Sequence, residues 1–239
     1  MRGQYVGLSH KIYPSLGMRN IPIPNEEKMM KRRDFAIALA LAPWATGAVR
    51  AASEIHEGEN YTRLPTPMPI AVPGKIEVIE FFGYWCPHCN SLEPKLEPWV
   101  KALPADVNFR RIPVAWQDGQ VPYQKLFYAL EAMGANRDIH PKVFKAFHEQ
   151  HLRLDTYANT VAFAAAIGMD RVKLSEALNA FSVATKIKVA SQQASAYEIE
   201  GVPTLVVNGK YATSPETAKG EMQALNVVES LIQKARAER

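Results

Sequence analysis

Strand patterns occur in two separate parts of this 239-residue chain. Residues 76–82 and 107–114 are rich in branched and aromatic side chains, which is typical of buried strands. The next strand patterns come only at 204–207 and 210–212, and Asn208-Gly209 between them is typical of a type I′ hairpin turn. Helical patterns fill the long interval. The sequence therefore predicts an α/β domain that is interrupted by an all-helical insertion.

The boundaries of the insertion follow from its helical patterns and from the glycines and prolines that separate them. The expected helices are 122–133, 141–150, 156–167 and 170–180, followed by a longer one at 182–199. We assign residues 121–181 to the helical insertion, and 52–120 together with 182–239 to the α/β domain. A last amphipathic helix follows the hairpin and carries Met222, Leu225, Val228, Leu231 and Ile232 on one face.

The two cysteines, Cys86 and Cys89, lie where a helix is expected to begin, just after the first strand. Pro87 occupies a first-turn position, where its missing N–H group costs nothing. The apolar face of this helix is predicted to bury Leu92, Leu96, Trp99, Val100 and Leu103. Because Pro94 and Pro98 lie within the helix, we expect a kink.

A Cys-x-x-Cys pair can be a structural disulfide, half of a metal site or a redox centre. Closing a loop of four residues restricts the unfolded chain by only about 2 kcal/mol, the least that a disulfide offers. A metal site needs two more ligands, and His148 and His151 are spaced more closely than zinc fingers require. We expect these histidines to be solvated or to cap a helix, and we expect no metal. The redox interpretation is the one we favour, because it has a chemical mechanism.

Thiol–disulfide exchange needs an exposed thiolate and a partner thiol that is close enough to close the ring. At the start of a helix, Cys86 would face unpaired N–H groups and the positive end of the helix dipole, which stabilise a thiolate. His88 can add a hydrogen bond or a positive charge, and Cys89 can reach back from one turn later. Because a stabilised thiolate leaves easily, the sequence predicts an oxidant that gives its disulfide away.

The charges lie unevenly along the chain. Residues 1–51 contain eight of the 28 basic side chains and three of the 24 acidic ones. Residues 52–239 therefore hold 20 basic and 21 acidic side chains, without a basic run, although the whole chain has a formal net charge of +4. This distribution argues against a nucleic-acid partner.

The basic residues of the first part belong to a segment with the order of an export signal. Lys31-Arg32-Arg33 precedes an apolar stretch at 35–42, and small residues follow. The apolar stretch is too short to span a membrane, so we predict that residues 29–51 are a cleavable export signal. The general secretion route and the twin-arginine route both remain open.

Residues 1–28 show neither a helical nor a strand period. A signal peptide begins at the initiator methionine, and Met29 and Met30 directly precede the basic residues. We therefore expect residues 1–28 to be a non-native upstream extension, with synthesis beginning at Met29 or Met30.

The run Phe81-Phe82-Gly83-Tyr84-Trp85-Cys86-Pro87-His88-Cys89 resembles the active-site segment of the DsbA thiol:disulfide oxidoreductases of bacterial periplasms. Pro-His between the cysteines is the dipeptide of the DsbA oxidants, and Gly201-Val202-Pro203-Thr204 is similar to the cis-proline loop of that family. The resemblance covers nearly all of residues 52–239. It implies a thioredoxin-like fold with an all-helical domain inserted, thiol:disulfide oxidoreductase activity and a periplasmic location.

The resemblance also implies the roles of the residues nearest the reaction. Cys86 would be the attacking cysteine and Cys89 the resolving one, with Pro87 and His88 between them completing the catalytic motif. Val202 and Pro203 would face the disulfide across a cis peptide bond, and their backbone groups would pair with an extended substrate segment.

Three further residues near the motif are candidates for the site. Glu80 matches a buried acid of the family and would relay a proton to Cys89, although an ordinary strand glutamate is the alternative. Tyr84 and Trp85 could belong to the core or could edge the substrate groove, and we favour the groove because they flank an exposed cysteine.

The leading hypothesis is a periplasmic dithiol oxidase that passes its disulfide to newly exported, unfolded proteins. By resemblance, a quinone-linked membrane partner of the DsbB type would reoxidise it, and the Cys86–Cys89 disulfide would make any other cofactor unnecessary. We expect a monomer. The alternatives are a reductase or isomerase on the same fold, and a thioredoxin-fold binding module or metallochaperone that uses the cysteines as ligands.

Overall fold

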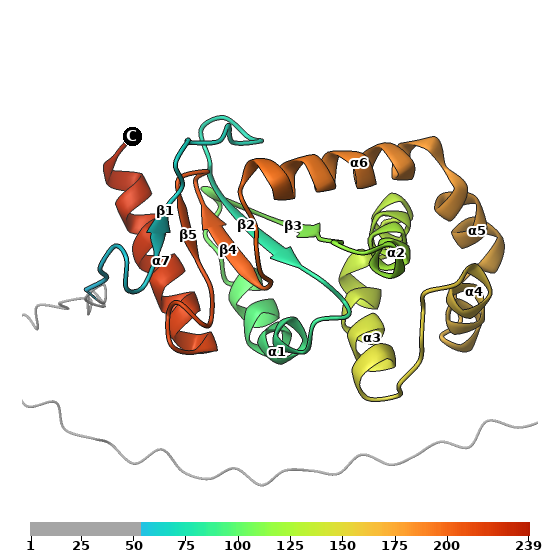
Figure 1. The fold of residues 1–239 in the computed structure, drawn as a ribbon. Coiled ribbons are helices and arrows are strands. Elements are labelled where there is room, and N and C mark those ends of the chain that lie inside the picture. Colours follow the sequence, from blue (N-terminus) through green and yellow to red (C-terminus); the bar gives the residue numbers. More distant parts are fainter. Residues whose placement is uncertain (1–53) are drawn as a thin grey trace, which may run out of the picture. The chain divides into compact units, whose positions relative to one another are not determined.

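The computed structural model describes residues 54–239, which contain a five-stranded mixed sheet (Figure 1). The strands are β1 (Thr62–Arg63), β2 (Ile76–Phe82), β3 (Val107–Pro113), β4 (Thr204–Val207) and β5 (Tyr211–Thr213), in the order β1-β5-β4-β2-β3. β2 runs parallel to β3 and antiparallel to β4, and all seven of its residues are buried. The strands predicted from branched and aromatic runs are thus confirmed.

The two faces of the sheet pack against different helices. Helices α1 (Pro87–Lys101) and α7 (Glu221–Ala237) lie next to each other against one face (Figure 1). Val78 of β2 belongs to the apolar cluster that these two helices share, whereas Ile79 belongs to the cluster shared with the remaining helices. Because side chains alternate along a strand, Glu80 lies on the same face as Val78 and points toward α1.

Helix α1 continues through both of the prolines within it. Of the five apolar residues predicted to be buried, Leu92 and Leu96 are fully buried, and the other three are partly buried at the margin of the same cluster. Glu93 is also buried, although the apolar periodicity of the sequence gave no reason to expect a carboxylate there.

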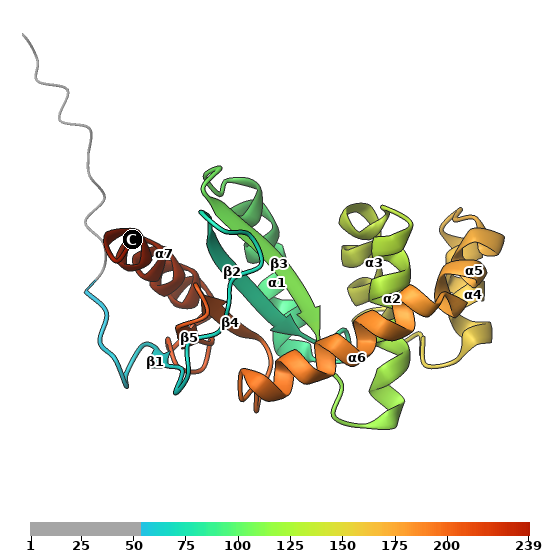
Figure 2. The ribbon, with the colours of Figure 1, turned by 90° about the horizontal axis from the view of Figure 1, so that it is seen from above.

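Five helices separate β3 from β4 in the described part of the chain (Figure 2). They are α2 (Val121–Ala132), α3 (Asn136–His148), α4 (Tyr157–Ala166), α5 (Arg171–Asn179) and α6 (Phe181–Ala196), as the periodicity predicts. Helix α3 begins five residues before Pro141, the residue at which the sequence predicts its start. The additional turn buries Ile139 and His140, and this packing outweighs the hydrogen bond that Pro141 cannot donate. Helix α6 then runs back from the helical block to the sheet, and it contacts α2, α5 and β3.

The β4–β5 hairpin has the predicted type I′ turn, with φ of 53° at Asn208 and 63° at Gly209. Met68 packs directly against this turn, since its N–H donates to the Gly209 carbonyl oxygen at 2.8 Å. A Cβ atom on Gly209 would lie 2.2 Å from the Met68 carbonyl oxygen, so only glycine fits. The turn thereby fixes the chain that leads into β2.

The predicted export signal at 29–51 and the predicted upstream extension at 1–28 lie outside the described residues. Within residues 54–239, none of the helices has the length and apolar character needed to cross a membrane.

Candidate active site

The two cysteines lie at the junction of β2 and α1. Cys86 is the N-cap of α1 and has an extended backbone conformation, and Cys89 lies in the first turn. Both are free thiols; 4% of the Cys86 surface is exposed, whereas Cys89 is fully buried. Pro87 and His88 between them are exposed. An incoming thiol can therefore reach Cys86 but not Cys89.

The pKa values of the two thiols are shifted in opposite directions. A hydrogen bond from the Cys89 thiol is the largest cause that lowers the pKa of Cys86 to about 6, against the opposing effect of burial. The backbone N–H groups of Cys89 and His88 contribute next, and the charge of His88 contributes least. Burial, and then the hydrogen bond and charge of Cys86, raise the pKa of Cys89. Near neutral pH, Cys86 is mostly a thiolate while Cys89 keeps its proton.

The loop before β4 lies opposite Cys86. Its Val202-Pro203 peptide bond is cis, and the Sγ atom of Cys86 lies 3.2 Å from the Val202 carbonyl oxygen. Pro203 is buried, and Val202 is half-buried. The fold thus brings together the two segments in which the sequence placed the site.

A groove of about 780 Å³ begins at this loop. It is lined by residues 62–65, His88, residues 197–204 and residues 212–217, so it passes from the start of α1 across the cis-proline loop to the β1–β5 edge of the sheet. Val202 and Pro203 are among the lining residues, but Tyr84 and Trp85 are not.

Tyr84 lies in the core, so the prediction that it edges the groove is wrong. Only 1% of it is exposed, and its ring packs edge-on against Phe82 and Phe144. Its hydroxyl oxygen lies 2.7 Å from Nδ1 of His140 in α3. The turn between β2 and α1 directs the ring toward the aromatic side chains of α3, where it buries a large apolar area.

Trp85 is half-buried and packs against the exposed Trp116, with ring centroids 5.6 Å apart. Its indole N–H donates to the Val114 carbonyl oxygen at 3.4 Å. The indole ring also comes within 2.6 Å of the place where a Cβ on Gly83 would lie, which explains the glycine at that position. Trp85 therefore contributes apolar surface beside Cys86, outside the groove.

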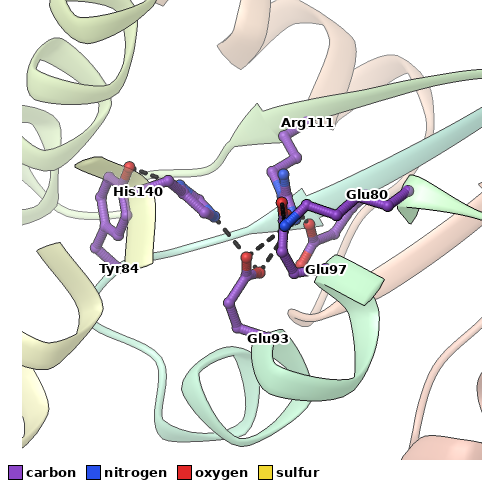
Figure 3. Close-up of polar contacts among 7 residues, drawn as sticks. Glu80, Tyr84, Glu93, Glu97, Arg111 and His140 are labelled. Atoms are coloured by element: carbon purple, nitrogen blue, oxygen red, sulfur yellow. Dashed lines mark hydrogen bonds and ion pairs between the residues drawn. The ribbon is translucent and has the colours of Figure 1, made fainter. Parts of the chain in front are cut away.

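The buried acid Glu80 belongs to a network that extends from β2 to α3 (Figure 3). Arg111 of β3 is its centre: Nε donates to Glu80 at 2.8 Å, and Nη2 donates to both oxygens of Glu93 at 3.1 and 3.2 Å. Glu97 accepts a longer bond of 3.4 Å from the same Nη2 atom. On the other side of Glu93, His140 Nε2 lies 3.5 Å from a Glu93 oxygen.

Burial dominates the electrostatics of this network. It raises the pKa values of Glu80 and Glu93 to about 7, although Arg111 opposes both shifts. Burial and the charge of Arg111 lower the pKa of His140 to about 3, so this ring is neutral. The charge of Glu80 is one of the causes that raise the pKa of Cys89, so the carboxyl acts on the buried thiol.

The sequence interpretation missed four members of this network: Glu93, Glu97, Arg111 and His140. Glu93 lies between Leu92 and Leu96 on the apolar face of α1. A charged residue on the apolar face of a helix indicates a buried charge with a partner, and this feature of the sequence could have revealed Glu93. His148, expected to be solvated or to cap a helix, instead donates from Nε2 to the Tyr84 carbonyl oxygen at 2.8 Å. Among residues 54–239, no three His, Cys, Asp or Glu side chains are grouped so that they could hold a metal ion.

A thiolate at a helix start, a buried partner thiol one turn later and a cis-proline loop against the thiolate define a thioredoxin-fold redox protein. Comparison with known proteins agrees, since residues 69–122 match thioredoxin and residues 117–225 match the DSBA-like thioredoxin domain.

Several relatives that match the chain over most of its length carry the same name. The thiol:disulfide interchange protein DsbA of Bordetella parapertussis is 41% identical over 209 residues, which are 87% of this chain and all of that protein. The protein of the same name from Pseudomonas aeruginosa is 39% identical over 80% of this chain and 90% of its own length. A crystal structure of Pseudomonas aeruginosa DsbA superposes with a TM-score of 0.75 at 40% identity, over 77% of this chain and 96% of that one. The chain belongs to the DsbA family, and it is a thiol:disulfide oxidoreductase.

Proposed function

We propose that this oxidoreductase is a dithiol oxidase, which transfers a Cys86–Cys89 disulfide to unfolded proteins that have just been exported. The opposite pKa shifts of the two thiols carry the proposal. A low pKa at Cys86 stabilises the reduced protein, in which Cys86 is a thiolate, and therefore favours donation of the disulfide.

The reaction has two exchange steps. In the first, a substrate thiolate attacks Sγ of Cys86; a bond between the two sulfurs forms, the Cys86–Cys89 bond breaks, and its electron pair goes to Cys89, which takes up a proton. In the second, another substrate thiolate attacks the substrate sulfur of the mixed disulfide and releases Cys86 as a thiolate. The substrate loses two electrons and the protein gains two. Cys86 keeps a small exposed surface of 4%, whereas Cys89 has none, and this difference supports the order of the two steps.

The residues around the cysteines take the following parts in the proposal. The backbone of Val202 and Pro203 pairs with an extended substrate segment, and the 3.2 Å contact of Cys86 with the Val202 carbonyl supports this placement. Pro87 starts α1, so that its first N–H groups face Cys86, and the exposed His88 favours the thiolate and lines the groove.

Two more residues assist the reaction in this proposal. Trp85 offers apolar surface beside the reacting sulfur. Glu80 gives a proton to Cys89 as the disulfide opens; its burial and its pKa of about 7 support a carboxyl that is partly protonated near neutral pH. Tyr84 takes no part in substrate binding, because it is buried.

In the cell, we propose that residues 29–51 direct export to the periplasm, where disulfides persist. A quinone-linked membrane oxidase of the DsbB type then restores the Cys86–Cys89 disulfide in a monomeric protein that uses no other cofactor. The α/β domain of residues 52–120 and 182–239 carries the cysteines, and residues 121–181 form the helical insertion.

Equilibration with glutathione buffers tests the direction of the reaction. We expect the protein to remain largely reduced in mixtures of reduced and oxidised glutathione that keep thioredoxin oxidised. A potential as reducing as that of thioredoxin would contradict the oxidase and favour a reductase. Cys86→Ser should abolish oxidation of a dithiol peptide; a variant that retained its whole effect on unfolded chains would indicate a binding module instead.

A further inference from the structure

The buried network contains more carboxylates than cations. Arg111 is paired with Glu80, Glu93 and Glu97, and among residues 54–239 only Glu97 has a further cation, Lys101 at 3.3 Å. The side chains of Glu80 and Glu93 are 1% and 6% exposed, so two full negative charges beside one guanidinium are costly there. The two carboxyls therefore share a proton near neutral pH, and which of them holds it decides whether an acid faces Cys89.

The hydrogen bond of Tyr84 fixes the position of the proton on His140. The only hydrogen-bond partner of the Tyr84 hydroxyl within residues 54–239 is Nδ1 of His140, at 2.7 Å. The hydroxyl must donate to this nitrogen, because otherwise its own hydrogen would be buried without an acceptor. A neutral imidazole that accepts at Nδ1 carries its hydrogen on Nε2.

The Nε2–H group of His140 points toward Glu93 (Figure 3). Nε2 has no hydrogen-bond partner within residues 54–239, and a Glu93 oxygen lies 3.5 Å from it. This oriented N–H favours the carboxylate form of Glu93 over the acid. Glu93 also accepts two bonds from Arg111, whereas Glu80 accepts one, so Glu93 is the better stabilised anion.

We propose that Tyr84 and His140 are positioning residues, which keep Glu93 ionised so that the proton shared by Glu80 and Glu93 rests on Glu80. The inference rests on the proposed role of Glu80 as the proton donor. When a substrate thiolate bonds to Sγ of Cys86, the Cys86–Cys89 bond breaks, its electron pair goes to the sulfur of Cys89, and the proton moves from Glu80 to that sulfur. Glu80 is left as a carboxylate beside Arg111, and no other reactant is needed.

Tyr84→Phe tests the proposal, because it removes the hydroxyl and keeps the ring. Without the Tyr84 hydroxyl, the hydrogen of the imidazole is no longer held on Nε2, so the shared proton shifts in part from Glu80 to Glu93. We expect the oxidised variant to react with a small dithiol about two- to fivefold more slowly than the unmodified protein at about pH 7. At about pH 5 both carboxyls hold a proton, so the two proteins should react equally fast. His140→Phe, which fits the same aromatic pocket, should show the same pH-dependent loss.

A second readout follows the proton itself. In the infrared difference spectrum between reduced and oxidised protein, the acid C=O band that disappears on reduction should be absent in Glu80→Gln. In Tyr84→Phe this band should be weaker, since part of the shared proton then lies on Glu93. Tyr128→Phe is the matched control: Tyr128 is buried, no hydrogen bond to its hydroxyl occurs within residues 54–239, and its removal should change neither rate nor band.

Introducing Tyr84→Phe into the Glu93→Gln variant distinguishes an effect on the shared proton from an effect on packing. Tyr84→Phe should have no additional effect there, because Glu93 can no longer compete for the proton. An equal slowing in that background, or at both pH values, would overturn the proposal. If Glu80→Gln reacts normally, the role of Glu80 fails; if Glu80→Gln is slow but Tyr84→Phe is not, only the positioning role fails.

Discussion

At the scale of single residues, the thiolate of Cys86 depends first on its partner cysteine and last on the histidine between them. Cys89→Ser keeps a hydrogen-bond donor at the right place, whereas Cys89→Ala removes it. Because a hydrogen bond to an anion contributes about 1.5 kcal/mol or more, we expect the pKa of Cys86 to be about one unit higher in the alanine variant. Titration of the ultraviolet absorbance of the thiolate measures both values. Identical titrations would show that the Cys89 thiol is not the dominant donor.

His88→Leu removes the smallest of the causes that lower the pKa of Cys86. We expect a rise in this pKa that is smaller than the rise in Cys89→Ala, and a protein that is correspondingly less oxidising in glutathione buffers, since each unit of pKa corresponds to about 1.4 kcal/mol. His151→Leu is the control, because His151 is exposed and lies outside the groove. An unchanged thiolate titration in His88→Leu would refute the role of His88.

The sequence was sufficient to predict the residues whose role follows from chain position. Cys86 at a helix start and Asn208-Gly209 in a hairpin depend on a few neighbouring residues, and the structure has both. Tyr84 was misplaced because the direction of a side chain in a β–α turn depends on distant packing partners, in this case Phe144 and His140. These partners are distant from Tyr84 in the sequence, so the residues around Tyr84 do not reveal them.

At the scale of elements, one arginine connects β3 to both β2 and α1. Arg111→Met would leave Glu80 and Glu93 buried without a cation, so we expect a loss of about 3–5 kcal/mol in the free energy of unfolding at about pH 8. In the folded protein both carboxyls have a pKa of about 7, above the unfolded value of about 4.3. Between these two pH values the folded state binds more protons than the unfolded state, so the free energy of unfolding falls as pH rises from about 4.3 to about 7. The variant raises both pKa values further.

The loss in Arg111→Met should therefore be smaller at about pH 5 than at about pH 8, where both carboxyls must ionise without a partner. Urea unfolding at the two pH values measures this difference. Arg111→Lys keeps the charge without the paired N–H groups and should be destabilised less. A loss in Arg111→Met that does not change with pH would show that packing, not charge, accounts for it.

Element prediction succeeded where one pattern governed a whole helix and failed where tertiary contacts competed with it. Helices α2, α4, α5 and α6 lie within a few residues of their predicted bounds. In α3, burial of Ile139 and His140 extends the helix ahead of Pro141, and this added turn supplies the imidazole of the network. The same competition buries Glu93 on a face that periodicity assigns to apolar residues.

At the scale of the whole molecule, the redox state and the stability of residues 54–239 are linked through protons. In the reduced protein, Cys86 has a pKa of about 6 when folded and about 8.5 when unfolded, so unfolding takes up one proton between these values. Cys86 should therefore add about 1.4 kcal/mol to the free energy of unfolding of the reduced protein for each pH unit from about pH 6 to about pH 8.5, while Glu80 and Glu93 act in the opposite direction below about pH 7. This gain is lost as pH falls through about 6.

The oxidised protein has no titrating thiol, so its stability lacks this dependence, while the destabilising ionisation of Glu80 and Glu93 affects both redox states. Subtracting the free energy of unfolding of the oxidised protein from that of the reduced protein therefore leaves the contribution of the cysteines. We expect this difference to rise with pH, which means that the reduced protein becomes relatively more stable. Guanidinium unfolding of both forms at about pH 6 and about pH 8 measures the difference. Reduced Cys86→Ser should lose the pH-dependent gain. If the free energies of unfolding of the oxidised and reduced proteins changed with pH in parallel, folding would not stabilise the Cys86 thiolate. The driving force for donating the disulfide would then have to come from strain or from contacts elsewhere in the fold.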